Sequence, residues 1–490
     1  MDRIVVITCF ILFLASFTAI GALAARARKP SSEDYLVASR DVHPWLVALS
    51  AVSTNNSGYM FIGLIGFTWR QGVEAVWITS GWILGDLLTW FWVHRRVRCR
   101  SEALGAASVP TLLATDEEGE VSRPVAVAAG VLTLLFLGGY AAAQLKAGST
   151  TLHALFGWPM WAGSVLGVVI VTIYCLSGGI RASIWTDAAQ SVVMIVAMGS
   201  LLLACVARVG GPSALMVALR DIDPHLVALV PDGLVFGFGL YLLGFLAGGA
   251  ATIGQPHILV RFMAIDGAGS IGRARVVYFI WYTLFSAAAL AVGLYARVLL
   301  PDLGMGLGGA ALTTATEGAL PRLAVSLLPS VLIGLTLAGL FSATMSTADS
   351  QLLSCSAAVT QDVAPRFSQS YRASKIATLG VAALALAIAL TATRGVFSLV
   401  LVAWSVLGAA LGPVVIIRLA GRPLSGRLAL LMMGSGVATV LLWGASPYAG
   451  AVFKALPGMA VPLLLYLVAS LLGGWRLSRH PHPASDQHPR

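Results

Sequence analysis

The stretch that decides the fold is Ala48-Leu-Ser-Ala-Val-Ser-Thr-Asn-Asn-Ser-Gly-Tyr-Met60, which lies inside the apolar segment 44–68. That segment is long enough to cross a bilayer, which takes roughly 20 residues in a helix. Its centre, residues 53–58, consists only of Ser, Thr, Asn and Gly. Such residues are tolerated at membrane depth only where protein or a cavity satisfies their polar groups. We therefore predict a transmembrane helix that is broken at its centre and lines an internal site.

A second apolar segment, 233–256, is interrupted in a similar way. Its end reads Gly244-Phe-Leu-Ala-Gly-Gly-Ala-Ala-Thr-Ile-Gly-Gln-Pro256. Glycine is a poor helix former and leaves backbone carbonyls accessible. We expect a second broken helix here, with an ordinary glycine packing face as the alternative.

The composition of the whole chain is that of a membrane protein. The 490 residues are 58% hydrophobic and only 11% charged, whereas soluble domains carry about a quarter charged residues. This excludes a soluble enzyme, a disordered protein and a secreted disulfide scaffold. The five cysteines form no CxxC pair and no Cys/His cluster, so we expect no transition-metal site.

Thirteen apolar stretches approach the length of a membrane span. We predict an all-α polytopic membrane protein with about 13 transmembrane helices, at 4–24, 44–68, 75–93, 124–155, 158–178, 185–207, 233–256, 277–299, 329–361, 375–393, 396–417, 428–446 and 457–475. The first stretch is interpreted as an uncleaved helix, because Arg26, Arg28 and Lys29 follow it directly and resist export.

The positive charges set the expected orientation. With the N-terminus outside, the inner segments hold 22 of the 31 Lys and Arg residues and the outer segments hold 8. Cytoplasmic loops are enriched in these residues, so we expect an external N-terminus and a cytoplasmic C-terminus. The net charge of +10 then indicates loops that face anionic lipid, and not a nucleic-acid partner.

The two broken spans are five apart, being the second and the seventh. Five-helix units that begin at each, spans 2–6 and 7–11, enter the membrane from opposite sides and form an inverted repeat, and paired broken helices indicate a transporter's binding site. We expect one transporter domain over 1–490, with an extra helix at 1–30, repeats at 44–207 and 233–417, two C-terminal helices at 428–475 and a cytoplasmic tail at 476–490.

The ninth span carries a face of small and hydroxylated residues. Ala343, Ser346, Thr347, Ser350 and Ser354 follow helical spacing. Adjacent hydroxyl groups beside carbonyls freed by a helix break suit Na⁺, a hard cation that takes oxygen ligands. A small-residue seam between two helices is the alternative that periodicity alone leaves open.

Several segments resemble signatures of the sodium:solute symporter family, most closely its sodium/proline symporter branch. They are Ser50-Ala51 through Asn55, Ser57 and Gly58; Trp185-Thr-Asp187; Gly254-Gln-Pro-His257 with Arg261-Phe-Met-Ala264; Met345-Ser-Thr347 with Asp349-Ser-Gln-Leu-Leu353; and Ala403-Trp404 with Gly408-Ala-Ala-Leu-Gly-Pro413. Their order and spacing extend over nearly the whole chain. The resemblance implies a LeuT-like fold, in which spans 2–6 and 7–11 form the 5+5 inverted repeat, and alternating access driven by inward Na⁺.

The resemblance also implies the residues of the sites. The sodium site is implied at the carbonyls of Ser53, Asn56 and Ala343 and the hydroxyls of Ser346 and Thr347. Asp187 is implied in Na⁺ release or in a second ion site, with a helix N-cap as the alternative. The substrate candidates are Asn55, Ser57, Gly58, Gln144, Lys146, Gly248, Thr252 and Gln255. Gln144 and Lys146 lie about 200° apart on a helix, so one pocket can hardly contact both.

The chain departs from the proline symporters at the expected substrate site. They carry an Asp where this chain has Asn55, and bulky aromatic residues where it has Gly248 and Thr252. The small residues are expected to enlarge or reshape the pocket. Proline is therefore one candidate, and another amino or carboxylic acid stays open.

We expect a secondary active transporter that couples Na⁺ to symport of a small organic solute, with proline or a related amino acid as the best guess. The alternatives are an Na⁺- or H⁺-coupled carrier for a monocarboxylate and, in another class, a transporter-like solute sensor. An intramembrane enzyme is disfavoured, because all eight His lie at span ends, in loops or in the tail. Na⁺ is the expected coupling ion, with no organic cofactor. The expected partners are the solute and the lipid bilayer, and the oligomeric state stays open, a monomer included.

Overall fold

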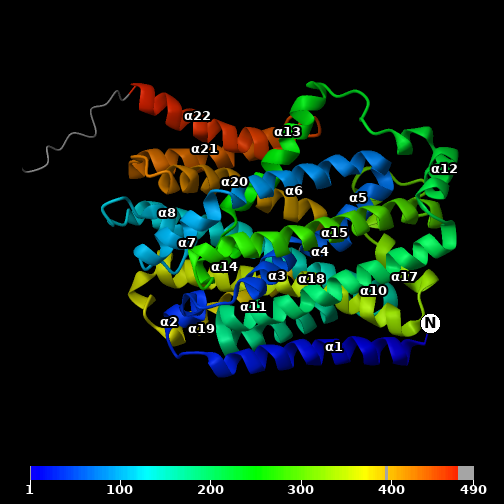
Figure 1. Ribbon diagram of the computed structural model, residues 1–490, viewed down its shortest axis with the longest axis horizontal. Coiled ribbons are helices and arrows are strands. Elements are labelled where there is room, and N and C mark those ends of the chain that lie inside the picture. The colour runs from blue at the N-terminus through cyan, green and yellow to red at the C-terminus, as the bar shows by residue number, and fades with distance from the viewer. Residues whose placement is uncertain (1, 392–395, 473–490) are drawn as a thin grey trace, which may run out of the picture.

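The structure is a computed structural model that describes residues 2–391 and 396–472, and the helices dominate it (Figure 1). The α-helices are α1 (Arg3–Ala24), α2 (Ser32–Val37), α3 (Pro44–Asn55), α4 (Gly58–Phe61), α5 (Gly63–Gln71), α6 (Val76–Trp90), α7 (Val93–Ala103), α8 (Val109–Ala114), α9 (Arg123–Leu132), α10 (Gly138–Phe156), α11 (Met160–Val209), α12 (Pro212–Ile222), α13 (Gly237–Ala250), α14 (Pro256–Ala264), α15 (Ile271–Leu299), α16 (Gly309–Thr316), α17 (Ala319–Leu327), α18 (Ser330–Ala357), α19 (Tyr371–Thr391), α20 (Val396–Leu419), α21 (Gly426–Ala445) and α22 (Ala455–Leu472).

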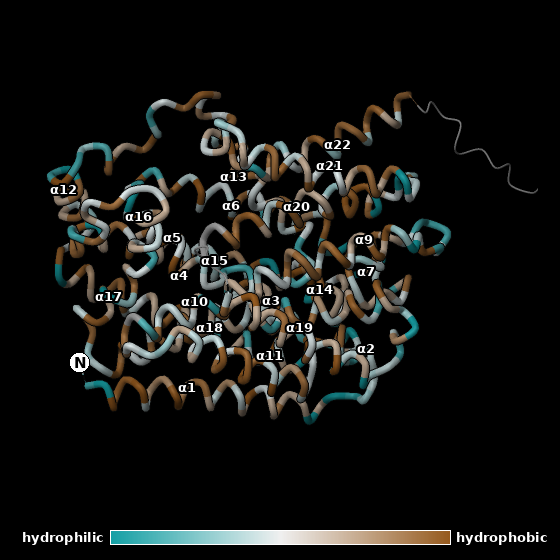
Figure 2. The backbone as a smooth tube through the Cα atoms, turned by 180° about the vertical axis from the view of Figure 1, so that it is seen from behind, coloured by the Kyte–Doolittle hydropathy of each residue, from teal (hydrophilic) through white to brown (hydrophobic). Residues whose placement is uncertain are grey.

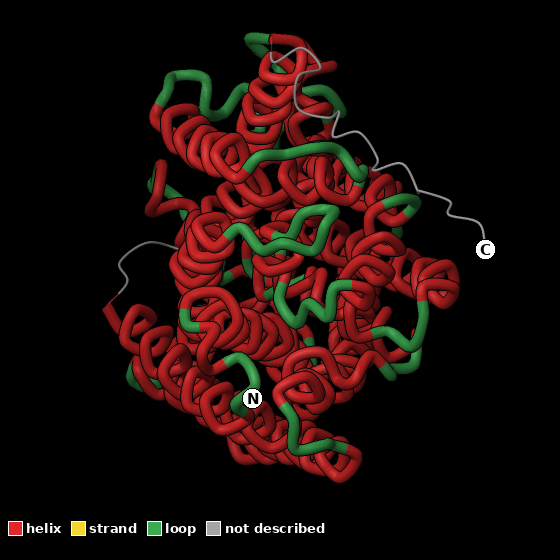
Figure 3. The backbone as a smooth tube through the Cα atoms, turned by 90° about the vertical axis from the view of Figure 1, so that its left-hand side faces the viewer, coloured by secondary structure: helices red, strands yellow, loops and turns green. Residues whose placement is uncertain are grey.

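The long helices run roughly along one axis, so that they are seen end-on when the molecule is turned by 90° (Figures 1 and 3). Hydrophilic segments gather towards the two ends of this axis, and the outer helices α1 and α22 are largely hydrophobic (Figure 2). Large apolar side chains such as Leu12 of α1 and Leu472 of α22 are exposed on these outer surfaces. This distribution suits a bundle whose sides contact lipid and whose ends contact water.

Within the described residues, ten helices are long and apolar enough to cross a membrane. One of them, α11, has 50 residues and a break at Gly179, where φ is 58° and ψ is −142°. At about 1.5 Å per residue this helix spans more than twice the ~30 Å hydrocarbon thickness, so it contains the predicted spans 158–178 and 185–207. A side chain at Gly179 would also meet the Tyr35 carbonyl oxygen at 2.4 Å. The total of thirteen spans stays a prediction.

Both predicted helix breaks are confirmed. The first follows α3, where Asn56 leaves the helical region with φ −89° and ψ 58°. The hydroxyl of Ser57 then caps α4 by accepting a hydrogen bond from the Tyr59 amide at 3.2 Å. The second break follows α13 as a short 3₁₀ turn, Ala251–Gly254. The helix restarts at Pro256, a residue suited to a first helical turn because it needs no amide donor there.

Helix α18 forms the centre of the bundle, where it packs against α3, α10 and α11 (Figure 1). Every residue from 336 to 358 is buried. The helix therefore places its small and hydroxylated residues directly against the break after α3. The division into repeats at 44–207 and 233–417 stays a prediction, and the predicted tail, 476–490, lies outside the described residues.

Candidate functional site

The first break and α18 bring carbonyl and hydroxyl oxygens together at the centre of the molecule. The Ser346 hydroxyl lies 3.3 Å from the carbonyl oxygens of both Ser53 and Ala343. The Thr347 hydroxyl lies 3.0 Å from the carbonyl oxygens of Thr54 and Ala343. All of these residues are buried. We call this group, Ser53, Thr54, Ala343, Ser346 and Thr347, the oxygen cluster.

The oxygen cluster follows from ordinary helix geometry. The last four carbonyls of a helix lack an intrahelical partner, and α3 ends at Asn55, so Ser53 and Thr54 present such carbonyls to α18. Asn56 instead turns its side-chain amide to the Val52 carbonyl oxygen at 2.9 Å. The Thr54 carbonyl was missed from the sequence, although the rule for helix ends could have found it.

A buried ion pair lies beside the oxygen cluster. Oδ2 of Asp187 is 3.0 Å from Nη2 of Arg261, and both side chains are fully buried. The Ser50 hydroxyl donates to the same carboxylate oxygen at 2.7 Å. The Ser53 hydroxyl, from the cluster itself, donates to the Asp187 backbone carbonyl at 3.3 Å. Asp187 lies well inside α11, seven residues after Ile180 where that helix resumes, so the N-cap alternative does not fit its position.

A second carboxylate completes this charged network. Arg261 also donates to the hydroxyl of Ser350, which in turn donates to Oδ1 of Asp349 at 2.7 Å. Within the described part of the chain, Oδ1 of Asp187 and Oδ2 of Asp349 have no hydrogen-bond partner. The sequence marked Arg261 only as part of a signature, because nothing in its spacing shows that it reaches α11.

Three substrate candidates meet at the first break. The Gly58 amide donates to Oε1 of Gln144 at 3.0 Å, and the Tyr140 hydroxyl donates to the hydroxyl of Ser57 at 3.1 Å. A side chain on Gly58 would meet Thr344 at 2.7 Å. Gln144 is fully buried and its Nε2 has no partner among the described residues. Lys146 is only partly buried on the same helix, as expected for a residue on the opposite face.

The other candidates meet at the second break, where Trp404 of α20 bridges the two sides. Its Nε1 donates to the Gly248 carbonyl at 2.8 Å, and its carbonyl accepts from Nε2 of Gln255 at 2.9 Å. Thr252 donates to the Gly249 carbonyl at 2.7 Å. The space above Gly248 is filled, because a side chain there would lie 2.6 Å from Nε1 of Trp82 on α6. Glycine at this position therefore reshapes the site without leaving it empty.

Asn55 points away from the oxygen cluster and towards α6 and α15. Its Nδ2 donates to the Tyr278 hydroxyl at 2.6 Å and lies 3.5 Å from Oδ2 of Asp86. The structure thus separates Asn55 from Ser346 and Thr347, on the other side of the break.

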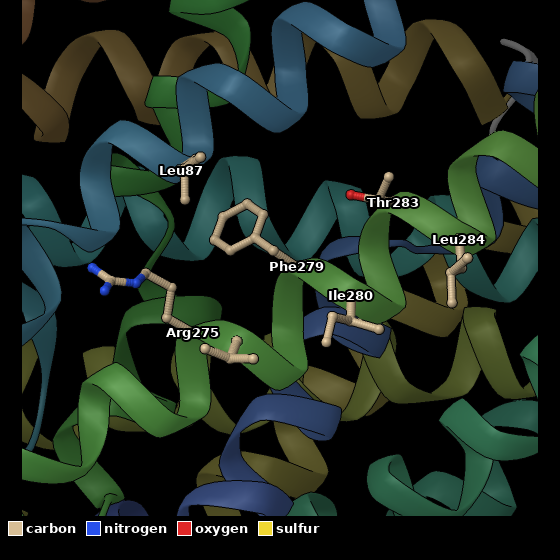
Figure 4. A pocket seen from close by; sticks show the side chains of 7 residues that line it. Leu87, Arg275, Phe279, Ile280, Thr283 and Leu284 are labelled. Carbon is tan, nitrogen blue, oxygen red and sulfur yellow. The ribbon is translucent and has the colours of Figure 1, made fainter.

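The cavities differ in size and in their position relative to the breaks. A surface groove of about 550 Å³ lies between α6 and α15 and is lined by Arg275, Phe279 and Ile280 among others (Figure 4). None of its lining residues belongs to either break, and it faces outwards, since Ile280 is 57% exposed. A cavity of about 10 Å³ lies near the first break, lined by Tyr59, Trp82 and Tyr282 among others. That volume suits about one water molecule, so this cavity does not hold an organic solute in this conformation.

Known proteins match the chain over most of its length. The sodium/proline symporter of Escherichia coli (strain K12) is 31% identical over 475 residues, which cover 95% of this chain and 92% of that protein. The high-affinity proline transporter PutP of Bacillus subtilis (strain 168) is 28% identical over 459 residues, covering 91% and 94%.

Solved structures share the fold. A Na⁺-coupled sialic acid symporter in a substrate-bound outward-open state superposes with a TM-score of 0.77 at 18% identity, covering 96% of this chain and 97% of that one. Mhp1, a nucleobase-cation-symport-1 family transporter, superposes with a TM-score of 0.52 at 14% identity, covering 91% and 96%. These likenesses confirm the predicted all-α LeuT-like fold.

The family was predicted from five short signatures, and the comparison with family models tests it over a much longer range. The model of the sodium:solute symporter family matches residues 35–433, which include both breaks, α18 and Trp404. With this match and the 31% identity to a relative, the chain belongs to the sodium:solute symporter family.

Proposed function

We propose that this chain is an Na⁺-driven symporter for proline or a related amino acid. Membership of the family makes it a transporter rather than an enzyme, with Na⁺ as the coupling ion and a small organic solute as cargo. The observation that carries the proposal is the oxygen cluster, because neutral oxygens from two helices meet beside a helix break. The printed names of the relatives support proline as the first solute to test.

The oxygen cluster is the proposed sodium site. Ser53, Thr54 and Ala343 contribute carbonyls, and Ser346 and Thr347 contribute hydroxyls, with Asn56 kept as a candidate next to them. Oxygen ligands of this kind suit a hard cation. The donors come from α3 and from α18, so a bound ion holds these two helices together. Na⁺ therefore favours the conformation in which the break is packed against α18.

Asp187 is the proposed release path for the ion. Its carboxylate is linked to the cluster through the hydroxyl of Thr54, at 3.5 Å, and through Ser50. Arg261 neutralises one of its oxygens, and the other has no partner among the described residues. A cation that leaves the cluster on this side meets a carboxylate that a buried guanidinium already holds in place.

The solute is proposed to lie between the two breaks, next to the cluster. The N-terminus of α4 at Gly58 favours a carboxylate, because helix N-termini carry free amides and partial positive charge. Gln144 now accepts from that amide and keeps its own Nε2 free among the described residues. The remaining candidates lie at the two breaks, Ser57 at the first and Gly248, Thr252 and Gln255 at the second. Lys146 is the weakest candidate, since it lies on the partly exposed face of α10.

The chain is a multi-pass protein of the inner membrane. We place its N-terminus outside and its C-terminus in the cytoplasm, which is supported by the 22 Lys and Arg residues on the inner segments against 8 on the outer ones.

The proposal is tested by uptake of radiolabelled L-proline into proteoliposomes. We expect uptake that requires an inward Na⁺ gradient, collapses with a sodium ionophore and is absent in a Ser346→Ala/Thr347→Ala variant. Proton-driven uptake that ignores Na⁺ would contradict the proposed coupling. Na⁺-dependent uptake of a monocarboxylate in place of proline would keep the coupling and replace the solute, and solute binding without uptake would favour the sensor alternative.

A further inference from the structure

Asp86 is a buried carboxylate that the proposed mechanism does not use. It lies on α6 and is 1% exposed. Its Oδ2 accepts a hydrogen bond from the Tyr278 hydroxyl at 2.6 Å, and its Oδ1 lies 3.4 Å from the hydroxyl of Thr89. Among the described residues, no Lys, Arg or His forms an ion pair with it. Burying a charged group without a partner is costly, and intramembrane acids usually mark a functional site.

This carboxylate lies against both helix breaks. Asn55, the last residue of α3, donates to Tyr278 and lies 3.5 Å from Oδ2 of Asp86. On the other side, α6 packs against the 3₁₀ turn Ala251–Gly254 of the second break. The backbone of α6 also packs tightly on the second broken helix, since a side chain on Gly249 would lie 2.8 Å from the Asp86 amide. Asp86 therefore lies next to a residue of the first break, Asn55, and against the helix that leads into the second.

The small cavity beside the first break begins one helical turn away. Trp82, four residues before Asp86, and Tyr282, four residues after Tyr278, both line it. Residues four apart share a helix face, so both pairs point into the same region. The hydroxyl of Ser286, which also lines the cavity, has no hydrogen-bond partner among the described residues and can accept from a cationic group. The ring of Tyr282, this hydroxyl and a carboxylate without a paired cation together form a surface suited to a cationic group.

We propose that Asp86 is a cation-binding residue of the transport site and that it binds a group with a single positive charge. The aromatic lining favours the protonated amine of a transported amino acid as this group, and a second sodium ion is the other candidate. The inference rests on the proposed function and deepens it. It also accounts for Asn55, where the resemblance to proline symporters leads to an Asp: the carboxylate beside the break is present, but α6 supplies it.

The test compares Asp86→Asn with a charge-relocated double variant, Asn55→Asp/Asp86→Asn, in the full-length protein. Asparagine keeps the shape and removes the charge, and the double variant returns a carboxylate to the same spot. Asp362→Asn is the matched control, because Asp362 is equally buried and accepts from Ser108 and Thr111 at 2.9 and 2.6 Å, at a different place in the fold. Binding of L-proline is measured at saturating Na⁺, against tetrahydro-2-furoate, which lacks the amine. The Na⁺ midpoint, which is the Na⁺ concentration that gives half of the maximal thermal stabilisation, is measured without any organic solute.

If Asp86 binds the amine of the solute, Asp86→Asn weakens proline binding about 10- to 100-fold, as expected for the loss of a charge-assisted hydrogen bond. Binding of tetrahydro-2-furoate and the Na⁺ midpoint stay unchanged, and the double variant recovers proline binding. If Asp86 instead binds a second sodium ion, Asp86→Asn raises the Na⁺ midpoint and weakens the binding of both solutes equally. The proposal is overturned if Asp86→Asn leaves proline binding and the Na⁺ midpoint within about twofold of the wild type, or if Asp362→Asn causes the same losses.

Failure of the proposed function gives a different pattern. If the wild type binds no proline but is stabilised by Na⁺, the solute assignment is wrong. The Na⁺ midpoint alone then decides whether Asp86 binds a cation. A midpoint that rises in Asp86→Asn supports the second sodium ion, and an unchanged midpoint overturns the proposal. If Na⁺ stabilises neither protein and proline does not bind, both the proposed function and the role of Asp86 fall together.

Discussion

Replacing Thr347 by valine removes one oxygen from the proposed sodium site while keeping the volume of the side chain. The Thr347 hydroxyl lies 3.0 Å from the carbonyl oxygens of both Thr54 and Ala343, so it belongs at once to α18 and to the break after α3. The residue is fully buried, so water does not replace the missing oxygen without repacking. Thr347→Val therefore tests whether this hydroxyl is a ligand or only part of a packed seam between two helices.

The expected loss follows from the strength of one polar contact to a charge. An interaction of this kind in a protein is worth about 1.5–3 kcal/mol, which corresponds to a roughly 10- to 150-fold weaker apparent affinity for Na⁺. Thr347→Ser keeps the oxygen and loses a methyl group, so its Na⁺ affinity should stay within about threefold of the wild type. The solute affinity at saturating Na⁺ should change little in either variant.

The assay is the initial rate of L-proline uptake in proteoliposomes as a function of external Na⁺, supported by the Na⁺-induced thermal shift of the purified protein. Thr336→Val is the matched control. Thr336 lies on the same helix, is also buried, and donates to the Leu332 carbonyl at 2.8 Å, four residues back, as Thr347 does to Ala343. Among the described residues its hydroxyl bonds only within α18, so its loss should leave the Na⁺ dependence unchanged.

Two results would refute the reasoning. If Thr347→Val keeps the wild-type Na⁺ dependence, the hydroxyl is not a ligand and the seam between α3 and α18 is structural. If Thr336→Val shifts the Na⁺ dependence equally, the effect reports a general weakening of α18. A weaker Na⁺ affinity in Thr347→Val alone supports the sodium site.

Three further predictions concern packing and charge. In Gly249→Ala, the new side chain would lie 2.1 Å from the Trp82 carbonyl oxygen, and such overpacking costs about 1–3 kcal/mol, so the melting temperature in detergent should fall; an unchanged value would show that α6 and α13 separate easily. Arg261→Gln breaks a fully buried ion pair with its carboxylate partner on α11, which costs about 3–5 kcal/mol and should abolish transport even where protein is recovered; wild-type uptake would contradict a role for this pair. Although burial raises it, hydrogen bonds from Arg181 and its neighbours hold the pKa of Asp34 below its ordinary value of 3.8, so this stabilisation is complete above that value and is lost as the pH falls through the lower folded pKa; acid melting curves of Arg181→Met should lack this part of the decline.

Much of the fold was predictable because membrane helices leave strong patterns. The two breaks were found because polar and glycine residues stand out in apolar segments, and the Ser346-Thr347 face was found from helical spacing. The partner helices were not predictable in the same way. That Asn55 faces α6 and α15 while Ser53 faces α18 depends on how the chain leaves α3 at its break, and no periodicity encodes that direction. The ion pair of Arg261 was not predictable either, because its carboxylate partner is distant in sequence.

The position of α6 changes the interpretation of the residues at which this chain departs from the proline symporters. The sequence suggested that Gly248 enlarges or reshapes the pocket, and that Asn55 lacks the charge of the Asp that the proline symporters carry there. In the structure, the indole of Trp82 occupies the space above Gly248, stacked between the rings of Tyr59 and Trp404 at 5.6 and 5.5 Å. One turn along the same helix, Asp86 places a carboxylate 3.5 Å from Asn55.

Both groups that the two breaks lack, an aromatic ring and a carboxylate, are thus delivered by one helix. A site rebuilt in this way can keep the chemistry of an amino-acid pocket while changing its shape, because ring and charge now approach from α6 and not from the broken helices. The solute specificity of this chain is therefore expected to depend on α6 as much as on the breaks. Paired substitutions at 82 with 248 and at 86 with 55 should then be more informative than single ones, since residues in direct contact share their energetic effects.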